Sequence, residues 1–234
     1  MRSLIFCLFA SIFAIPMKCN NPNRREYPVM GIDMSHHQGR VNWDKIKASK
    51  VSFIYMKATE GGDFKDSMFV FNWALAKTLA FKRGAYHFFT FCRSGDEQAR
   101  NFLETVKIEE GDLPPVLDLE FGGNCSKKIF TKEQLIDEMQ EFLYAIEKDM
   151  CAKPILYTTN SFYKEYIKGR FPGYQIWIRD ILTRPNLPDD REWTFWQYKV
   201  DTLHGVDGDV DLNVFNGDST EFQKLAIMGC GEVL

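Results

Sequence analysis

Pro114-Pro115-Val116-Leu117-Asp118-Leu119-Glu120 is the stretch from which the fold and chemistry of this chain can be argued. Two prolines lead into a short apolar run, typical of a buried strand, and two carboxylates close that run. Because residues i and i+2 of a strand share a face, Asp118 and Glu120 should point to the same side. Glycosidases use two nearby carboxyl groups, one protonated and one ionised. A strand that simply ends in a polar loop is the plainer alternative for this stretch.

Around this stretch, short apolar runs alternate with longer amphipathic stretches, which is the pattern of βαβ units. The predicted strands are 29–34, 52–57, 83–89, 115–120, 154–158, 175–178, 194–198 and 209–214. The predicted helices are 43–48, 67–80, 97–106, 131–148 and 161–168. Five βα units followed by three plain strands predict a single α/β domain, an irregular TIM-like barrel of the type (β/α)5(β)3.

In barrels of this kind, the chemistry lies at the face where the strands end. Suggestive side chains fall at the predicted strand ends: Asp33, Lys57, Tyr86, Asp118, Glu120, Tyr157, Trp177, Gln197, and Asp211 with Asn213 on the last strand. A random scatter of polar residues would not repeat this position from strand to strand. The sequence therefore predicts that these residues share one site.

Several ordered motifs in the chain resemble glycoside hydrolase family 25, the Chalaropsis-type lysozymes or N-acetylmuramidases. The motifs are GIDMSHHQG at 31–39, YMKATEG at 55–61, RGAYHFF at 83–89, PVLDLE at 115–120, WQY at 196–198 and GDVDLN at 208–213. The similarity spans about residues 29 to 217. It implies a (β/α)5(β)3 barrel that hydrolyses the β-1,4 bond between N-acetylmuramic acid and N-acetylglucosamine in peptidoglycan.

The resemblance also implies roles for individual residues. Glu120 matches the family's general acid/base, and Asp33, Asp118 and Asp211 match the acidic residues around its cleft. Asp118 would either stabilise the oxocarbenium-like transition state or orient the sugar's N-acetyl oxygen for attack, and the sequence leaves both open. The residues expected to bind substrate are Tyr86, Tyr157, Trp177, Gln197 and Lys57.

Plainer interpretations compete at some of these positions. Lys57 and Glu60 could form only a local ion pair that shapes the rim of the cleft. Asp209 shares a face with Asp211, and only the resemblance favours Asp211. The sixth predicted strand continues as Arg179-Asp180, where many family members carry a small residue.

A metal site is a further hypothesis, because His36 and His37 follow Asp33. Adjacent histidines in a strand point to opposite faces, and no cluster has metal-ligand spacing. We therefore expect no metal and no other cofactor. The tryptophans Trp43, Trp73 and Trp193 are expected to pack in the core.

Three other functions would leave different signs in the sequence. A metal-dependent polysaccharide deacetylase would need a metal. A non-catalytic glycan-binding module would have lost the acid at position 120, yet Glu120 is present. A chitinase would carry further acidic residues where this chain has Pro114-Pro115-Val116.

The N-terminal part of the chain is expected to direct export. Residues 1–19 resemble a secretory signal, with Arg2 ahead of an apolar run at 4–16 that is short for a membrane span. A retained N-terminal anchor is the alternative. The expected divisions are then a linker at 20–26, the catalytic barrel at 27–225 and a C-terminal tail at 226–234.

Export implies a secreted or periplasmic protein, and disulfides are possible there. Cys92 and Cys125 each follow a predicted strand, so their loops should meet at one face of the barrel. Cys151 precedes a strand and should lie at the opposite face. We therefore predict a Cys92–Cys125 disulfide, with two unpaired thiols that flank the cleft as the alternative.

The expected partner of the protein is the glycan strands of peptidoglycan. The net charge of the chain is −3, and nucleic-acid binding would need a basic surface. Nothing in the sequence indicates an obligate protein partner.

Overall fold

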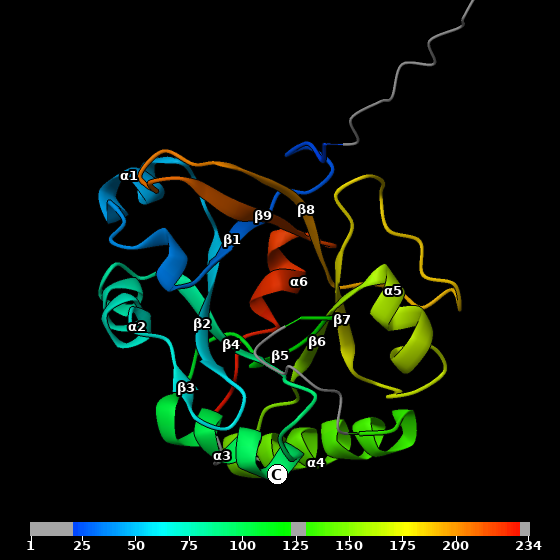
Figure 1. Cartoon of the computed structure of the whole chain (residues 1–234). Helices are drawn as coiled ribbons and strands as arrows, with labels where there is room; N and C mark the ends of the chain where they lie inside the picture. The colour runs from blue at the N-terminus through cyan, green and yellow to red at the C-terminus, as the bar shows by residue number, and fades with distance from the viewer. Residues whose placement is uncertain (1–20, 123–129, 230–234) are drawn as a thin grey trace, which may run out of the picture.

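A closed barrel of eight strands forms the centre of the protein (Figure 1). The computed structural model describes residues 21–122 and 130–229. The barrel strands are β1 (Met30–Met34), β2 (Phe53–Glu60), β4 (Lys82–Phe88), β5 (Val116–Leu119), β6 (Ile155–Thr159), β7 (Gln175–Arg179), β8 (Phe195–Thr202) and β9 (Asp209–Phe215). They pair in the order β1-β9-β8-β7-β6-β5-β4-β2, and β1 also pairs with β2, which closes the ring. The predicted (β/α)5(β)3 barrel is confirmed.

The last strand runs against its neighbours. Strands β1 to β8 of the barrel pair in parallel, whereas β9 is antiparallel to both β8 and β1. The expectation that Asp211 and Asn213 end the last strand is therefore wrong, because Asp211 lies near the start of β9. The reversed direction brings that start to the rim where the parallel strands end, and Asp211 is paired with Asp33 of β1.

Helices follow the first five parallel strands of the barrel. They are α1 (Trp43–Ala48), α2 (Phe69–Thr78), α3 (Gly95–Thr105), α4 (Lys132–Met150) and α5 (Asn160–Phe162), and α5 continues as a π-helical turn at Tyr163–Ile167. The long helix α4 begins with a capping box, in which the Thr131 side chain accepts from the Gln134 backbone and the Gln134 side chain accepts from the Thr131 backbone. This reciprocal cap fixes where α4 starts beneath the sheet.

Three short elements were not predicted. A 3-10 turn spans His36–Gln38, strand β3 (Phe64–Lys65) forms a hairpin with β2, and α6 comprises Ser219–Gln223. In the view of Figure 1 α6 lies within the outline of the ring of strands, and Phe222 is its one buried residue, which packs against the inner core of the barrel. All three are too short to show a reliable periodicity, although Asp218 and Glu221 form a capping box that marks the start of α6.

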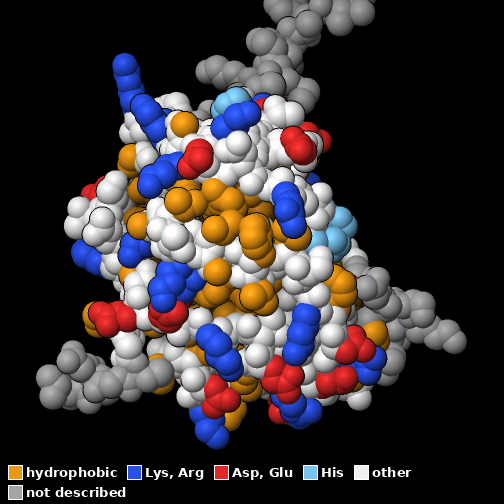
Figure 2. All heavy atoms as spheres, turned by 90° about the vertical axis from the view of Figure 1, so that its left-hand side faces the viewer, with side chains coloured by type: hydrophobic (Ala, Val, Ile, Leu, Met, Phe, Trp, Pro, Cys, Tyr) orange, Lys and Arg blue, Asp and Glu red, His pale blue; other side chains and the backbone are white. Residues whose placement is uncertain are grey.

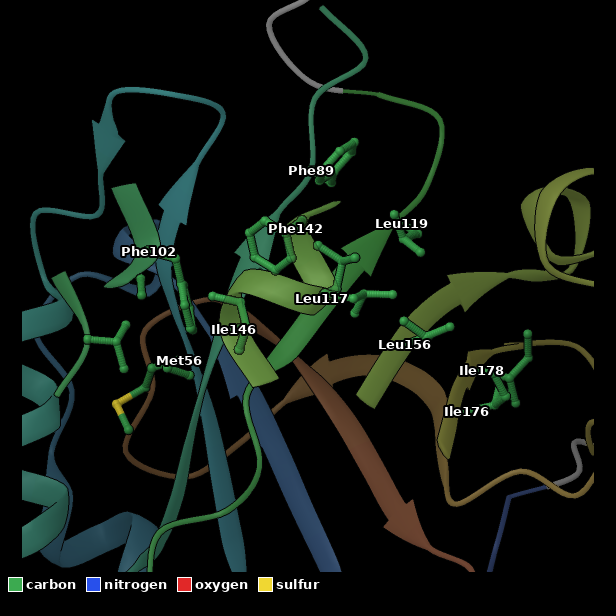
Figure 3. Close-up of a cluster of buried hydrophobic side chains, with 14 of the residues drawn as sticks. Met56, Phe89, Phe102, Leu117, Leu119, Phe142, Ile146, Leu156, Ile176 and Ile178 are labelled. Atoms are coloured by element: carbon green, nitrogen blue, oxygen red, sulfur yellow. The ribbon is translucent and has the colours of Figure 1, made fainter. Parts of the chain in front are cut away.

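Alternation along the strands divides the apolar side chains into two cores. Figure 3 shows the outer core, where strand residues such as Leu117, Leu119 and Leu156 face Phe102 of α3 and Phe142 of α4. Burial of one such side chain stabilises the fold by about 1.5–3 kcal/mol. The outer core fixes the strands against the helices and so holds the rim in place.

The inner core fills the lower part of the barrel with aromatic rings. Tyr55, Trp177 and Phe195 pack against one another with ring centroids 4.9 to 5.9 Å apart. Gly84 is required beside them, because a Cβ there would lie 2.1 Å from the ring of Tyr55. The filled interior leaves open only the end of the barrel that carries the polar side chains.

The tryptophans expected in the core are there. Trp43 and Trp193 are buried, and Trp73 packs partly buried against the outer core. Asp209 is exposed, in contrast to Asp211.

One face of the protein carries exposed apolar side chains. Figure 2 shows them gathered on the side of the molecule that bears α1 and α2, with charged side chains around them. Val70 and Phe71 of α2 are among the exposed hydrophobic residues, and the Arg40 guanidinium lies 5.9 Å from the centre of the Phe71 ring. Within residues 21–122 and 130–229, no helix is long and apolar enough to cross a membrane.

Candidate active site

All nine residues predicted to form the site line one cavity of about 550 Å³. They are Asp33, Lys57, Tyr86, Asp118, Glu120, Tyr157, Trp177, Gln197 and Asp211. Asp118 and Glu120 both face this cavity. The alternate residues of the same strand, Leu117 and Leu119, pack on the outside of the barrel. The structure thus brings these nine side chains together, and a cavity of this size is in the usual range for ligand sites.

Asp33 is held by amide groups from the last two strands. Gln197 Nε2 and Asn213 Nδ2 both donate to Asp33 Oδ2, at 2.9 and 2.7 Å. Tyr157 donates to the other end of the Gln197 amide at 2.9 Å. Trp177 Nε1, which can only donate, bonds to Asn213 Oδ1 at 2.9 Å and so fixes the orientation of that amide. The network sets the position of the Asp33 carboxyl group.

Asp118 differs from Asp33 in its partners. It is equally buried, but its Oδ1 has no hydrogen-bond partner among the described residues. A buried acceptor left without a donor costs about 1–3 kcal/mol, so such an atom needs an explanation. Asp118 also lines the cavity.

Each of the four carboxyl groups of the cavity has a raised pKa. Burial is the largest cause for Asp33, Asp118, Glu120 and Asp211 alike. The negative charge of Glu120 raises the pKa of Asp118 further, and that of Asp211 raises the pKa of Glu120. Burial and mutual repulsion thus favour the protonated forms in this cavity.

Two positive charges oppose this effect. Arg179 lowers the pKa of both Glu120 and Asp211, and Lys57 lowers the pKa of Asp118. Lys57 Nζ also lies 2.6 Å from Glu60 Oε2, so the expected local ion pair is present. Lys57 is therefore the charge that favours an ionised Asp118.

The histidine argument from sequence needs correction. His36 and His37 lie in a 3-10 turn and not in a strand, so their rings do not point to opposite faces but lie side by side, tilted at 38° with centroids 4.1 Å apart. His36 Nδ1 lies 2.8 Å from Asp66, and His37 lines the cavity. Across residues 21–122 and 130–229, no group of three or more His, Cys, Asp or Glu side chains is placed to hold a metal ion.

Cys92 and Cys151 are both disulfide-bonded. The predicted partner of Cys92 is Cys125, which lies outside the described residues. The Cys92–Cys125 pairing stays a prediction.

Two groups at the site, Asn213 behind the cavity and Arg179 in its lining, have no role assigned from the sequence. Asn213 belongs to the motif at 208–213 and completes the network around Asp33. Arg179 ends β7 and lines the cavity beside the acidic residues. Strand alternation was the signal for Arg179, because it lies two residues after the inward-facing Trp177.

These features define a carbohydrate-cleaving type of enzyme, in which paired carboxyl groups meet at the open end of an α/β barrel. The sequence-family model described as glycosyl hydrolases family 25 matches residues 32–205 of this chain. The chain therefore belongs to glycoside hydrolase family 25, and it is a hydrolase of the lysozyme type, as the sequence motifs predicted.

Relatives and solved structures agree with this assignment. A family 25 glycosyl hydrolase from Bacillus anthracis is 37% identical, with a TM-score of 0.83 over 89% of this chain and 97% of that one. The Escherichia coli protein YegX, which is uncharacterised, is 36% identical over 84% of this chain and 73% of its own length. Lysozyme M1 of Streptomyces globisporus is 34% identical over 85% of this chain and 71% of its own length.

Proposed function

We propose that this protein cleaves the β-1,4 bond between N-acetylmuramic acid and N-acetylglucosamine in peptidoglycan, with Glu120 as general acid/base and Asp118 as its partner. The observation that carries the proposal is this pair of carboxyl groups, which lie two residues apart and face one cavity. Glycosidases need one protonated and one ionised carboxyl group on either side of the reacting bond.

Glu120 suits the acid role because it is half-buried. Burial raises its pKa, which keeps the carboxyl group protonated to higher pH than in water. Its remaining exposure lets it reach a glycosidic oxygen in the cavity. In the first step Glu120 gives its proton to that oxygen as the bond to the anomeric carbon breaks. In the second step the Glu120 carboxylate takes a proton from the attacking water.

Asp118 suits the role of a partner to the sugar's N-acetyl group. Its unpartnered Oδ1 is a buried acceptor, and the acetamido N–H is a donor of matching kind. An ionised Asp118 that accepts this bond turns the acetamido oxygen toward the anomeric carbon and stabilises the positive charge that develops there. Lys57 supports this step by favouring the ionised form.

The remaining site residues position the sugar in this proposal. Asp33 is held rigidly by Gln197 and Asn213, which suits a fixed acceptor for a sugar hydroxyl. Tyr86 and Tyr157 line the cavity, where apolar faces of a sugar can pack against them, and the buried Trp177 acts mainly by holding the Asn213 amide.

The substrate also suggests where the protein acts. Peptidoglycan lies outside the plasma membrane, and we propose that residues 1–19 direct export and that 27–225 is the catalytic barrel. The disulfide-bonded state of Cys92 and Cys151 agrees with an oxidising compartment. Residues 1–19 themselves lie outside the described residues.

Product analysis tests the proposal directly. Purified peptidoglycan is incubated with the protein, the products are reduced with borotritide, and the labelled sugar is identified. We expect the label on muramitol, because cleavage should free the reducing end of N-acetylmuramic acid. Label on glucosaminitol alone, or no new reducing ends, would refute the proposed bond specificity.

A further inference from the structure

Two cationic side chains, Lys57 and Arg179, line the cavity, and they differ in whether they form an ion pair with a carboxylate. Lys57 is paired with Glu60 at 2.6 Å, and its ammonium group lies 4.8 Å from the centre of the Phe88 ring. Arg179 has no carboxylate within 4.0 Å among the described residues. Arg179 is partly buried at the end of β7, where its backbone is paired with Thr159 of β6 and Gln197 of β8. The donors of Arg179 thus remain open to the cavity.

The acidic residues of the cavity would disfavour an anionic substrate, and the Arg179 guanidinium opposes this effect. Four carboxyl groups line the same space, and each ionised one would repel an anionic substrate. The guanidinium offers a planar fork that matches a carboxylate in two parallel hydrogen bonds. A neutral amino sugar can accept single hydrogen bonds from this fork, whereas a sugar that carries a carboxylate can accept two parallel, charge-assisted ones.

We propose that Arg179 binds a carboxylate of the substrate, so that it distinguishes a glycan that carries this carboxylate from the same glycan without it. This inference rests on the proposed function and specifies its substrate. The carboxylate has two sources of the same chemistry. One is the lactyl group of muramic acid in peptide-free strands, and the other is the peptide that is attached to that lactyl group in the intact wall.

Three substrates separate these possibilities. The first is peptide-free glycan strands, with free lactyl carboxylates. The second is the same strands after chemical reduction of those carboxylates to alcohols. The third is peptide-bearing strands, in which the lactyl carboxyl is an amide and only the peptide is anionic. The variants are Arg179→Gln, Arg179→Lys and the matched control Arg100→Gln. The control removes an exposed arginine of α3 that pairs with Asp96.

We expect Arg179→Gln to raise KM about tenfold on strands with the relevant carboxylate, as for loss of a hydrogen bond between charged groups. KM on the reduced strands should change less than about twofold. Arg179→Lys should recover part of the loss, because the charge remains but the fork does not. Arg100→Gln should match the wild type on all three substrates.

The comparison is made between substrates within each variant. Arg179 also lowers the pKa of Glu120 and Asp211, but that effect is common to all substrates and cancels in the ratio. A KM increase on the first substrate indicates the lactyl carboxylate, and one on the third indicates the peptide. Equal changes on all three substrates would overturn the inference, while wild-type protein that cleaves none of them would instead refute the proposed function.

Discussion

Replacing Glu120 by Gln should remove most of the activity while leaving the barrel intact. The amide keeps the shape of the side chain but cannot donate an acidic proton to a glycosidic oxygen. General acid catalysis contributes typically about 10²–10⁴-fold in rate. At 1.36 kcal/mol for each factor of ten, this corresponds to about 2.7–5.4 kcal/mol of the activation barrier.

The same substitution should stabilise the fold at neutral pH. Because burial raises the pKa of Glu120 in the folded protein, the unfolded chain loses this proton at lower pH than the folded protein does. Stability is then lost as the pH rises from the ordinary pKa of 4.5 through the folded value. Gln has no proton to lose and also removes a negative charge beside Asp118. The melting temperature of Glu120→Gln should match the wild type near about pH 4 and exceed it at about pH 7.

The assay combines release of reducing ends from peptidoglycan with thermal melts at both pH values. Glu104→Gln is the matched control, because Glu104 is an exposed residue of α3 that pairs with Lys65 at 3.3 Å. This control should keep wild-type activity and show no gain in stability that grows with pH. Near wild-type activity in Glu120→Gln would remove Glu120 from the acid role. A lower melting temperature at both pH values would contradict the burial argument.

Three further predictions concern the other parts of the site. Asp118→Asn should lower kcat with little change in KM, because its charge acts mainly in the transition state, and a large rise in KM at constant kcat would assign it to binding alone. Asn213→Ala should destabilise the fold by about 2–4 kcal/mol, because Asp33 Oδ2 loses one donor and Trp177 Nε1 loses its acceptor, and an unchanged denaturation midpoint would refute this. Exhaustive chelation should leave activity intact, since no metal-ligand cluster occurs in the described parts of the chain, and activity that returned only with added metal would contradict it.

Much of this architecture follows from local pattern. Buried strands with one polar end were predicted because alternation along a strand needs only the neighbouring residues, and the same rule placed Asp118 and Glu120 on one face. The barrel and the meeting of nine site residues then followed from the order of the elements. Helix α4 was predicted well because its apolar face repeats over five turns and its cap is explicit.

Other features depend on contacts between distant residues. Strand β9 runs antiparallel to β8, to which a short connection at 203–208 joins it. The apolar pattern of a strand is the same in either direction and so does not indicate this reversal. The 3-10 turn at His36–Gln38 depends on Asp66, which accepts from the backbone of His36 at 2.9 Å across thirty positions of sequence. The lack of an ion pair at Arg179 among the described residues depends on where the fold places the carboxylates of other strands. None of these facts is contained in a single stretch of sequence.

The two buried aspartates of the cavity show how stability and chemistry are divided in this site. Asp33 on β1 accepts from Gln197 on β8 and Asn213 on β9, so its hydrogen bonds connect the first strand to the last two and help to close the barrel. Asp118 lies on the parallel side, where backbone pairing with β4 and β6 already holds the sheet, and it leaves Oδ1 unpartnered. Burying an unpaired acceptor is a cost that closure of the barrel does not require. In the mechanism that we propose, the missing bond is made when the substrate is bound, and the Asp118→Asn variant tests that role.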